Sequence, residues 1–173
     1  MKDTLISRRE FLKDIGMIGA GVLLSASPWL SAFSEVVETS GEKCRLAIIG
    51  PGSRGRFLMS FLVQNPKVEI VALCDIYQPS IEKALELAPK AKVYDDYREI
   101  LEDKTVDAVL VATPLNSHCQ IVLDAFDAGK HVFCEKSIGF TMEECFRIYN
   151  KHISTEKVFF TCLLYTSPSP RDA

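Results

Sequence analysis

The chain has 173 residues, of which 47% are hydrophobic and 25% are charged, a balance typical of a globular protein with one domain and short additional segments. The formal net charge of −3 gives no electrostatic reason to expect a nucleic acid as a partner. No apolar run is long enough to predict a stable membrane span in the mature protein. The six cysteines include no Cys-x-x-Cys pair, so we expect no metal site, and Cys74 and Cys134 are predicted to be buried free thiols.

The first 34 residues are predicted to be an export signal. A positive region, a short apolar stretch at residues 15–24 and a run of small residues follow one another in the order of a secretory signal. Residues 7–13, SRREFLK, resemble the twin-arginine signal, so we expect export by that pathway to the periplasm, with residues 35–43 as a polar linker. An amphipathic helix with a chance arginine pair and an uncleaved membrane anchor are the alternatives.

From residue 44 to residue 161, apolar runs alternate with stretches of helical spacing. Six runs are apolar on both faces, which predicts strands of a parallel sheet covered on both sides: 45–50, 68–75, 91–96, 106–114, 131–136 and 157–161. Five stretches with helical spacing or capping residues are predicted to be helices: 53–64, 79–88, 96–102, 117–128 and 141–151. The alternation predicts a doubly wound α/β fold of the Rossmann type, with a mostly parallel sheet that binds ligands at the carboxyl edge of its strands.

The first predicted strand runs into GPGSRG, a G-x-G-x-x-G sequence between a strand and a helix, which is the context of a dinucleotide-binding loop. Gly50 permits the tight turn, Gly52 lets the backbone approach a pyrophosphate, and Gly55 lets the helix pack close to the strand. The helix N-terminus offers N–H groups to the anion. The Ser53 hydroxyl and the Arg54 guanidinium are candidate further donors, with a solvated helix face as the alternative for the arginine.

Asp75 ends the second predicted strand, where a carboxylate can accept hydrogen bonds from the ribose hydroxyls of an adenosine. The same carboxylate would repel a 2′-phosphate, so NAD is favoured over NADP as the cofactor. The alternative is a strand-end aspartate that only caps the next turn.

Residues 111–144 resemble the nucleotide-binding half of the Gfo/Idh/MocA oxidoreductases. Three pieces carry the resemblance, and with the glycine loop they extend it over about residues 45–161: ATPLNSH at 112–118, GKHV at 129–132 and EK at 135–136. The resemblance implies that the cofactor groove is lined by four residues that follow the fourth strand: Thr113, Pro114, Asn116 and His118. For His118, a local hydrogen-bond partner is the alternative, and we do not expect it to be the catalytic base.

The resemblance also implies that Lys136 faces the nicotinamide and the substrate, while Glu135 helps to position the nicotinamide end. A lysine in that place could hydrogen-bond a substrate hydroxyl and favour its deprotonated form as a hydride leaves. The alternative for Lys136 is a surface lysine. Members of the family usually read Glu-Lys-Pro here, whereas this chain has Ser137 in place of the proline.

On this basis the intact protein is expected to be an exported, homo-oligomeric oxidoreductase that moves a hydride between NAD and a hydroxyl of a sugar, sugar derivative or cyclitol. The family has a second, antiparallel domain that supplies most of the substrate pocket, so we expect this chain to be the nucleotide-binding domain, inactive alone. One alternative is a glycosidase that keeps NAD bound and cleaves by transient oxidation and elimination, because SRREFLK and GPGSRGR resemble such relatives. A non-catalytic NAD-binding module is another.

The last segment, residues 162–173, differs from the rest in its serine and proline content. Its sequence resembles the translation of a sequencing-library adapter, and it begins where the family resemblance ends. We therefore expect an artefact without a biological role, with a natural Ser/Pro tail as the alternative.

Overall fold

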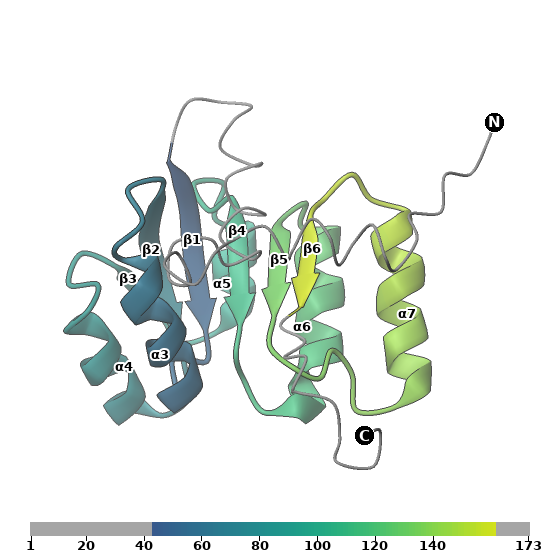
Figure 1. Ribbon diagram of the computed structural model, residues 1–173, viewed down its shortest axis with the longest axis horizontal. Helices are drawn as coiled ribbons and strands as arrows, with labels where there is room; N and C mark the ends of the chain where they lie inside the picture. The colour runs from purple at the N-terminus through teal and green to yellow at the C-terminus, as the bar shows by residue number, and fades with distance from the viewer. Residues whose placement is uncertain (1–42, 162–173) are drawn as a thin grey trace, which may run out of the picture.

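The computed structural model describes residues 43–161 (Figure 1). The predicted export signal, residues 35–42 of the predicted linker and the predicted adapter-derived tail lie outside the described residues. Within them, the six strands form one all-parallel sheet in the order β3-β2-β1-β4-β5-β6, which confirms the predicted α/β fold. The strands are β1 (Cys44–Ile49), β2 (Val68–Cys74), β3 (Lys92–Tyr94), β4 (Ala108–Val111), β5 (His131–Cys134) and β6 (Phe159–Thr161).

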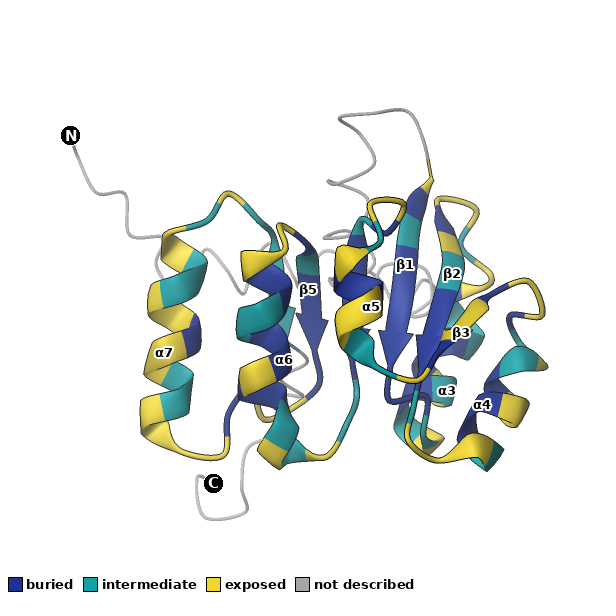
Figure 2. Ribbon diagram, turned by 180° about the vertical axis from the view of Figure 1, so that it is seen from behind, coloured by how far each residue is buried: buried dark blue, intermediate teal, exposed yellow. Residues whose placement is uncertain are grey.

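Helices cover both faces of the sheet, as strands that are apolar on both sides require. One face packs against α3 (Ser53–Leu62) and α4 (Gln78–Leu85). The other packs against α5 (Tyr97–Glu102), α6 (Leu115–Asp127) and α7 (Met142–Ile153), and Figure 2 shows this face with the buried strands behind the helices. Within residues 43–161, no helix has the length and apolar character that a membrane crossing needs.

The start of α6 differs from the prediction. The sequence Ser-x-x-Gln predicted a capping box that opens a helix at Ser117, but the helix begins at Leu115, with Pro114 as its N-cap. The Ser117 hydroxyl lies inside the first turn and donates to the Pro114 carbonyl at 2.7 Å. The extended backbone of the proline, with ψ of 144°, ends the preceding loop, so the helix starts two residues earlier than the capping pattern indicated. The capping box of Thr141 and Glu144 at the start of α7, in contrast, is confirmed.

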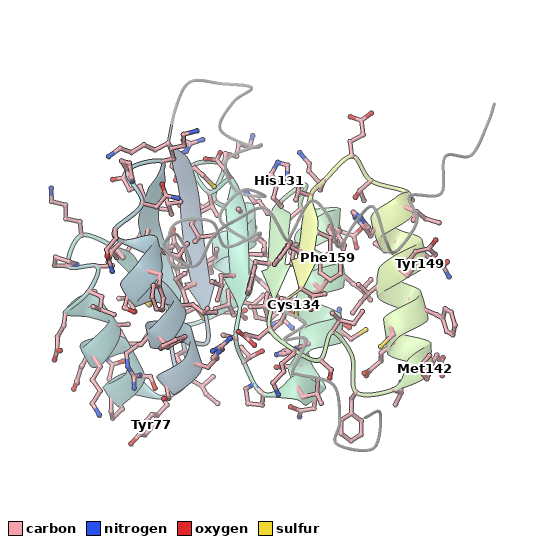
Figure 3. The ribbon with its side chains drawn as sticks, in the orientation of Figure 1. Tyr77, His131, Cys134, Met142, Tyr149 and Phe159 are labelled. Atoms are coloured by element: carbon pink, nitrogen blue, oxygen red, sulfur yellow. The ribbon has the colours of Figure 1, made fainter. Side chains whose placement is uncertain are left out.

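The outer face of α7 is apolar and exposed. Four large side chains on this face repeat at helical spacing: Met142, Phe146, Tyr149 and Ile153, which are 70%, 59%, 59% and 63% exposed. Figure 3 shows Met142 and Tyr149 pointing away from the sheet. An apolar surface of this kind is an aggregation liability when it stays in contact with water.

The register of the central strands aligns three loops at the carboxyl edge. Ile49 pairs with Val111, and Val111 pairs with Cys134, so β1, β4 and β5 end at the same level. Backbone hydrogen bonds continue this alignment into the loops, from the Ala112 N–H to the Ile49 carbonyl and from the Glu135 N–H to the Val111 carbonyl, both at 2.9 Å. The chain order reverses between β1 and β4, and such a switch point is where sheets of this class bind ligands.

At the opposite edge, His131 begins β5 and joins it to the segment that leads into β6. The Nδ1 atom of His131 accepts a hydrogen bond from the Val158 N–H at 3.0 Å, which requires an unprotonated nitrogen. Burial, together with the charge of Lys157, lowers the pKa of His131 below its ordinary value of 6.5. The folded state therefore favours the neutral ring.

We predict that acidification weakens this link. Because the pKa of His131 is lower in the folded state, its stabilising contribution is complete above about pH 6.5 and is lost as the pH falls toward the folded-state pKa. Over this range the free energy of unfolding should fall by up to about 1 kcal/mol, the contribution of one hydrogen bond. Urea denaturation followed by circular dichroism at several pH values measures this fall, and His131→Asn, which keeps an acceptor but cannot titrate, should reduce it. Equal pH dependence in the two proteins would contradict the prediction.

Candidate functional site

A pocket of about 310 Å³ opens at the carboxyl edge of the sheet, at the switch point between β1 and β4. Seven residues line it: Arg54, Ala112, Thr113, Leu115, His118, Glu135 and Lys136. Five of the candidate residues from the sequence are among them, contributed by α3, by the β4–α6 connection, by α6 and by the end of β5. The structure therefore brings together the glycine-loop helix and the two later segments that carry the family resemblance.

The three glycines of the loop have different reasons to be glycine. Gly50 has a φ of +84°, and a Cβ there would lie 2.8 Å from the backbone nitrogen of Thr113. A Cβ on Gly55 would lie 2.5 Å from the Gly50 carbonyl oxygen. A Cβ on Gly52 would meet nothing within 4 Å. The fold thus requires glycine at 50 and 55, whereas at Gly52 the absent side chain leaves free space in front of the backbone.

That space lies at the N-terminus of α3, which is suited to an anion. Gly52 is the N-cap, no side chain caps the helix, and its first turn contains no acidic residue. The first N–H groups of a helix have no partner within it, and they carry the positive end of the helix dipole. Ser53, the first residue of α3, is exposed beside them. An anionic group placed over Gly52 would find several backbone donors.

Asp75 follows β2 and lies close to the glycine loop, because the Gly50 N–H donates to the Cys74 carbonyl at 2.8 Å. Its Oδ1 atom accepts a hydrogen bond from the Tyr77 N–H at 2.9 Å, so the turn-capping role that the sequence allowed is present. One carboxylate oxygen in this role leaves the other available for a ribose. Ile76 and Tyr77, which sequence reasoning missed, expose apolar surface beside Asp75, at 100% and 62%. Their signal was two apolar residues directly after the acidic strand end.

Arg54 and Glu135 form an ion pair across the pocket. The Arg54 Nε atom lies 2.6 Å from Glu135 Oε1, and the Glu135 side chain is only 6% exposed. The second oxygen, Oε2, accepts from the Lys136 N–H at 3.1 Å. The sequence predicted that Arg54 contacts the pyrophosphate or lies on a solvated helix face. In the structure its guanidinium instead contacts the Glu135 carboxylate, directly after β5. This charge-assisted bond fixes the start of α3 to the loop that carries Lys136.

His118 forms part of the pocket wall and is 1% exposed. Its Nδ1 lies 2.8 Å from the Ser137 carbonyl oxygen, and its Nε2 lies 2.8 Å from the Thr113 carbonyl oxygen. Both ring nitrogens therefore face backbone carbonyls. Two other candidates from the same segment, Pro114 and Asn116, are exposed at the start of α6 and do not line the pocket.

Lys136 lines the pocket with an exposed side chain. The peptide bond that joins it to Ser137 is cis. Cys74 and Cys134, at the ends of β2 and β5, are buried free thiols, as predicted. Burial raises the pKa of Cys74 to about 11 and that of Cys134 to about 12, so both stay protonated at neutral pH and cannot serve as nucleophiles.

The sequence profile of a family described as "Oxidoreductase family, NAD-binding Rossmann fold" matches residues 44–162. The chain belongs to the Gfo/Idh/MocA family. It is therefore similar in fold and sequence to the NAD-binding domain of these oxidoreductases, and the pocket at the switch point lies within the matched region.

Solved structures also resemble the chain over about two thirds of its length. A myo-inositol dehydrogenase from Lactobacillus casei, in complex with NAD(H) and myo-inositol, has a TM-score of 0.66 and 33% identity, covering 69% of this chain and 36% of that one. An NAD-binding protein from Listeria innocua has a TM-score of 0.64 and 33% identity, covering 69% and 35%.

Among curated relatives, a "Glycosyl hydrolase family 109 protein" from Stenotrophomonas maltophilia is 34% identical over 162 residues, covering 87% of this chain and 34% of its own length. An "Alpha-N-acetylgalactosaminidase" from Shewanella oneidensis is 31% identical over 174 residues, covering 88% and 38%. The chain thus spans between a third and two fifths of the length of these relatives.

We predict that the Arg54–Glu135 pair supports the fold of the site. Arg54→Met leaves a nearly buried carboxylate without its partner, which should lower the free energy of unfolding by about 1–3 kcal/mol. The double variant Arg54→Met/Glu135→Gln should recover part of this loss, because the amide carries no charge. Arg56→Met is the matched control, since Arg56 lies in the same helix turn but donates to the Pro51 carbonyl. Urea denaturation measures these losses. If the double variant loses as much stability as Arg54→Met and Glu135→Gln lose separately when added together, the two side chains are not coupled.

Proposed function

We propose that the chain binds NAD at the carboxyl edge of its sheet. The observation that supports this most directly is the free space in front of Gly52, at the uncapped start of α3. A pyrophosphate there would receive backbone hydrogen bonds. The adenosine would then extend toward Asp75, Ile76 and Tyr77, and the nicotinamide would extend into the pocket of Glu135 and Lys136.

We further infer that NAD is preferred to NADP. Asp75 has a carboxylate oxygen beyond the one that caps the turn, and it can accept from a ribose hydroxyl. A 2′-phosphate in the same place would meet the negative charge of this carboxylate.

For the whole protein, we propose hydride transfer involving a hydroxyl of a sugar, sugar derivative or cyclitol. NAD, when bound, supplies the acceptor for the hydride. The role proposed for Lys136 is to donate a hydrogen bond to the substrate oxygen, which stabilises the negative charge that develops there as the hydroxyl loses its proton to a general base, before the hydride passes to NAD. Glu135, held by Arg54, would orient the nicotinamide end. The L. casei dehydrogenase, whose structure holds NAD(H) and myo-inositol, supports this substrate class.

The same proposal includes the export signal and a substrate domain in the remaining part of the whole protein. The whole protein is proposed to reach the periplasm through the twin-arginine pathway and to assemble as a homo-oligomer. Because the chain spans well under half of its curated relatives, the remaining part of the whole protein would supply most of the substrate pocket. The chain alone is then expected to bind the cofactor without turnover.

A second candidate function is an NAD-dependent glycosidase. The names of the S. maltophilia and S. oneidensis relatives favour it, since both denote glycoside hydrolysis. In such a reaction the same site would oxidise a ring carbon transiently and allow elimination of the leaving group. Release of a chromogenic group from an aryl glycoside by the intact gene product, without added NAD, would favour this candidate over a dehydrogenase.

The variant Gly52→Ala is expected to weaken NAD binding while leaving the stability of the fold nearly unchanged. Its Cβ fits the free protein but would occupy the space assigned to the pyrophosphate, so the Kd for NAD should rise at least about tenfold, while the free energy of unfolding changes by less than about 1 kcal/mol. Gly55→Ala is the contrasting variant, because its Cβ collides with the Gly50 carbonyl and should destabilise the fold. Isothermal titration with NAD and urea denaturation measure the two effects. Unchanged NAD affinity in Gly52→Ala would contradict the proposed pyrophosphate position.

Asp75→Ser tests the cofactor preference. The wild-type chain should bind NAD at least about tenfold more tightly than NADP, and the serine variant should reduce that ratio to near one by removing the repulsive charge. Titration of both proteins with both dinucleotides gives the ratio. Equal affinity of the wild type for NAD and NADP would overturn the preference while leaving dinucleotide binding intact.

A further inference from the structure

His118 connects the two loops that form the inner wall of the pocket. Thr113 belongs to the connection between β4 and α6, and Ser137 belongs to the connection between β5 and α7. The imidazole lies between their carbonyl oxygens, at 2.8 Å from each. The ring is buried, so water does not compete for either contact.

Through these contacts the imidazole ring can hold the backbone of the loops by hydrogen bonds. A carbonyl oxygen can only accept, so each hydrogen bond needs a proton on the imidazole nitrogen that faces it. A neutral ring donates to one of the two carbonyls, according to its tautomer, and a protonated ring donates to both. In each form the side chain holds at least one of the loops to α6.

The second of these loops carries Lys136, whose backbone is held on both sides. On its N-terminal side, the Lys136 N–H donates to Glu135, which is in turn paired with Arg54. On its C-terminal side, the next residue, Ser137, presents its carbonyl to His118. In the part of the chain that the structure describes, the hydrogen bonds that hold residues 136–140 come from side chains, since the ladder of β5 ends at Cys134.

We propose that His118 is a positioning residue for Lys136, acting through the Ser137 carbonyl rather than through contact with the cofactor. This inference rests on the proposed function, because it assigns His118 to the nicotinamide end of the NAD site. Both ring nitrogens are directed at backbone carbonyls, so neither is directed at a ligand. The histidine thus determines where the Lys136 ammonium stands relative to the nicotinamide, and the adenosine half of the site does not depend on it.

The test compares NAD with ADP-ribose, which lacks the nicotinamide, on the full chain. In the wild type, NAD should bind more tightly than ADP-ribose. His118→Phe fills the same space without a donor, and it should remove most of that preference while the Kd for ADP-ribose changes by less than about twofold. A residue needed only for stability would change both affinities together or neither.

Two conservative variants identify which hydrogen bond matters. In His118→Asn the amide nitrogen can take the place of Nδ1 and reach Ser137, and in His118→Gln it can take the place of Nε2 and reach Thr113. The asparagine should retain the preference for NAD, and the glutamine should lose it as the phenylalanine does. If the phenylalanine variant does not fold, as judged by circular dichroism and thermal denaturation, this pair decides the question.

The outcomes separate this inference from the proposed function. A wild-type chain that binds neither NAD nor ADP-ribose overturns both. A wild type that binds NAD and ADP-ribose equally, or a set of variants that all keep the preference, overturns only the role of His118. Loss of the preference in the glutamine variant with retention in the asparagine variant supports the role as stated.

Discussion

The alignment of three parallel strand ends is the constraint on which the site depends. Backbone hydrogen bonds from Ala112 to Ile49 and from Glu135 to Val111 bring the loops after β1, β4 and β5 to one level. The glycine loop, His118 and Lys136 come from these loops and from the helix starts that follow them. A shift of one residue in either strand pair would exchange the side chains that pack into the two hydrophobic cores, one on each face of the sheet, so the packing of both cores enforces the geometry of the pocket.

The ion pair between Arg54 and Glu135 also stabilises the pocket. Glu135 is a nearly buried carboxylate, and such a group is tolerated because it is paired with Arg54 and accepts the Lys136 N–H. The pair therefore has two effects at once: it compensates a buried charge, and it connects the first turn of α3 with the loop that carries the exposed lysine. His118 makes a corresponding connection, through backbone carbonyls, between the same loop and the loop after β4. Hydrogen bonds and an ion pair thus fix the side chains of Glu135 and His118.

Much of this was predictable from the sequence, because apolar periodicity and glycine spacing are local signals. The six strands, the parallel sheet and the requirement for glycine at 50 and 55 follow from such patterns. The Arg54–Glu135 pair could not be predicted, since it joins segments 81 residues apart and depends on side-chain direction. The start of α6 was misjudged because two local signals competed, and the fixed backbone of Pro114 prevailed over the capping pattern at Ser117. Ile76 and Tyr77 were missed because two apolar residues after a strand end do not by themselves show that their side chains are exposed.

The position of β1 has a consequence for how the protein is made. This strand is the first in the described chain, yet it lies at the centre of the sheet, between β2 and β4. Parallel neighbours cannot pair through a hairpin, so the edge of β1 that pairs with β4 stays unpaired until β4 has been synthesised. During translation, one edge of a largely apolar strand therefore remains unpaired until the second half of the sheet has formed, and an unpaired strand edge of this kind is prone to aggregation.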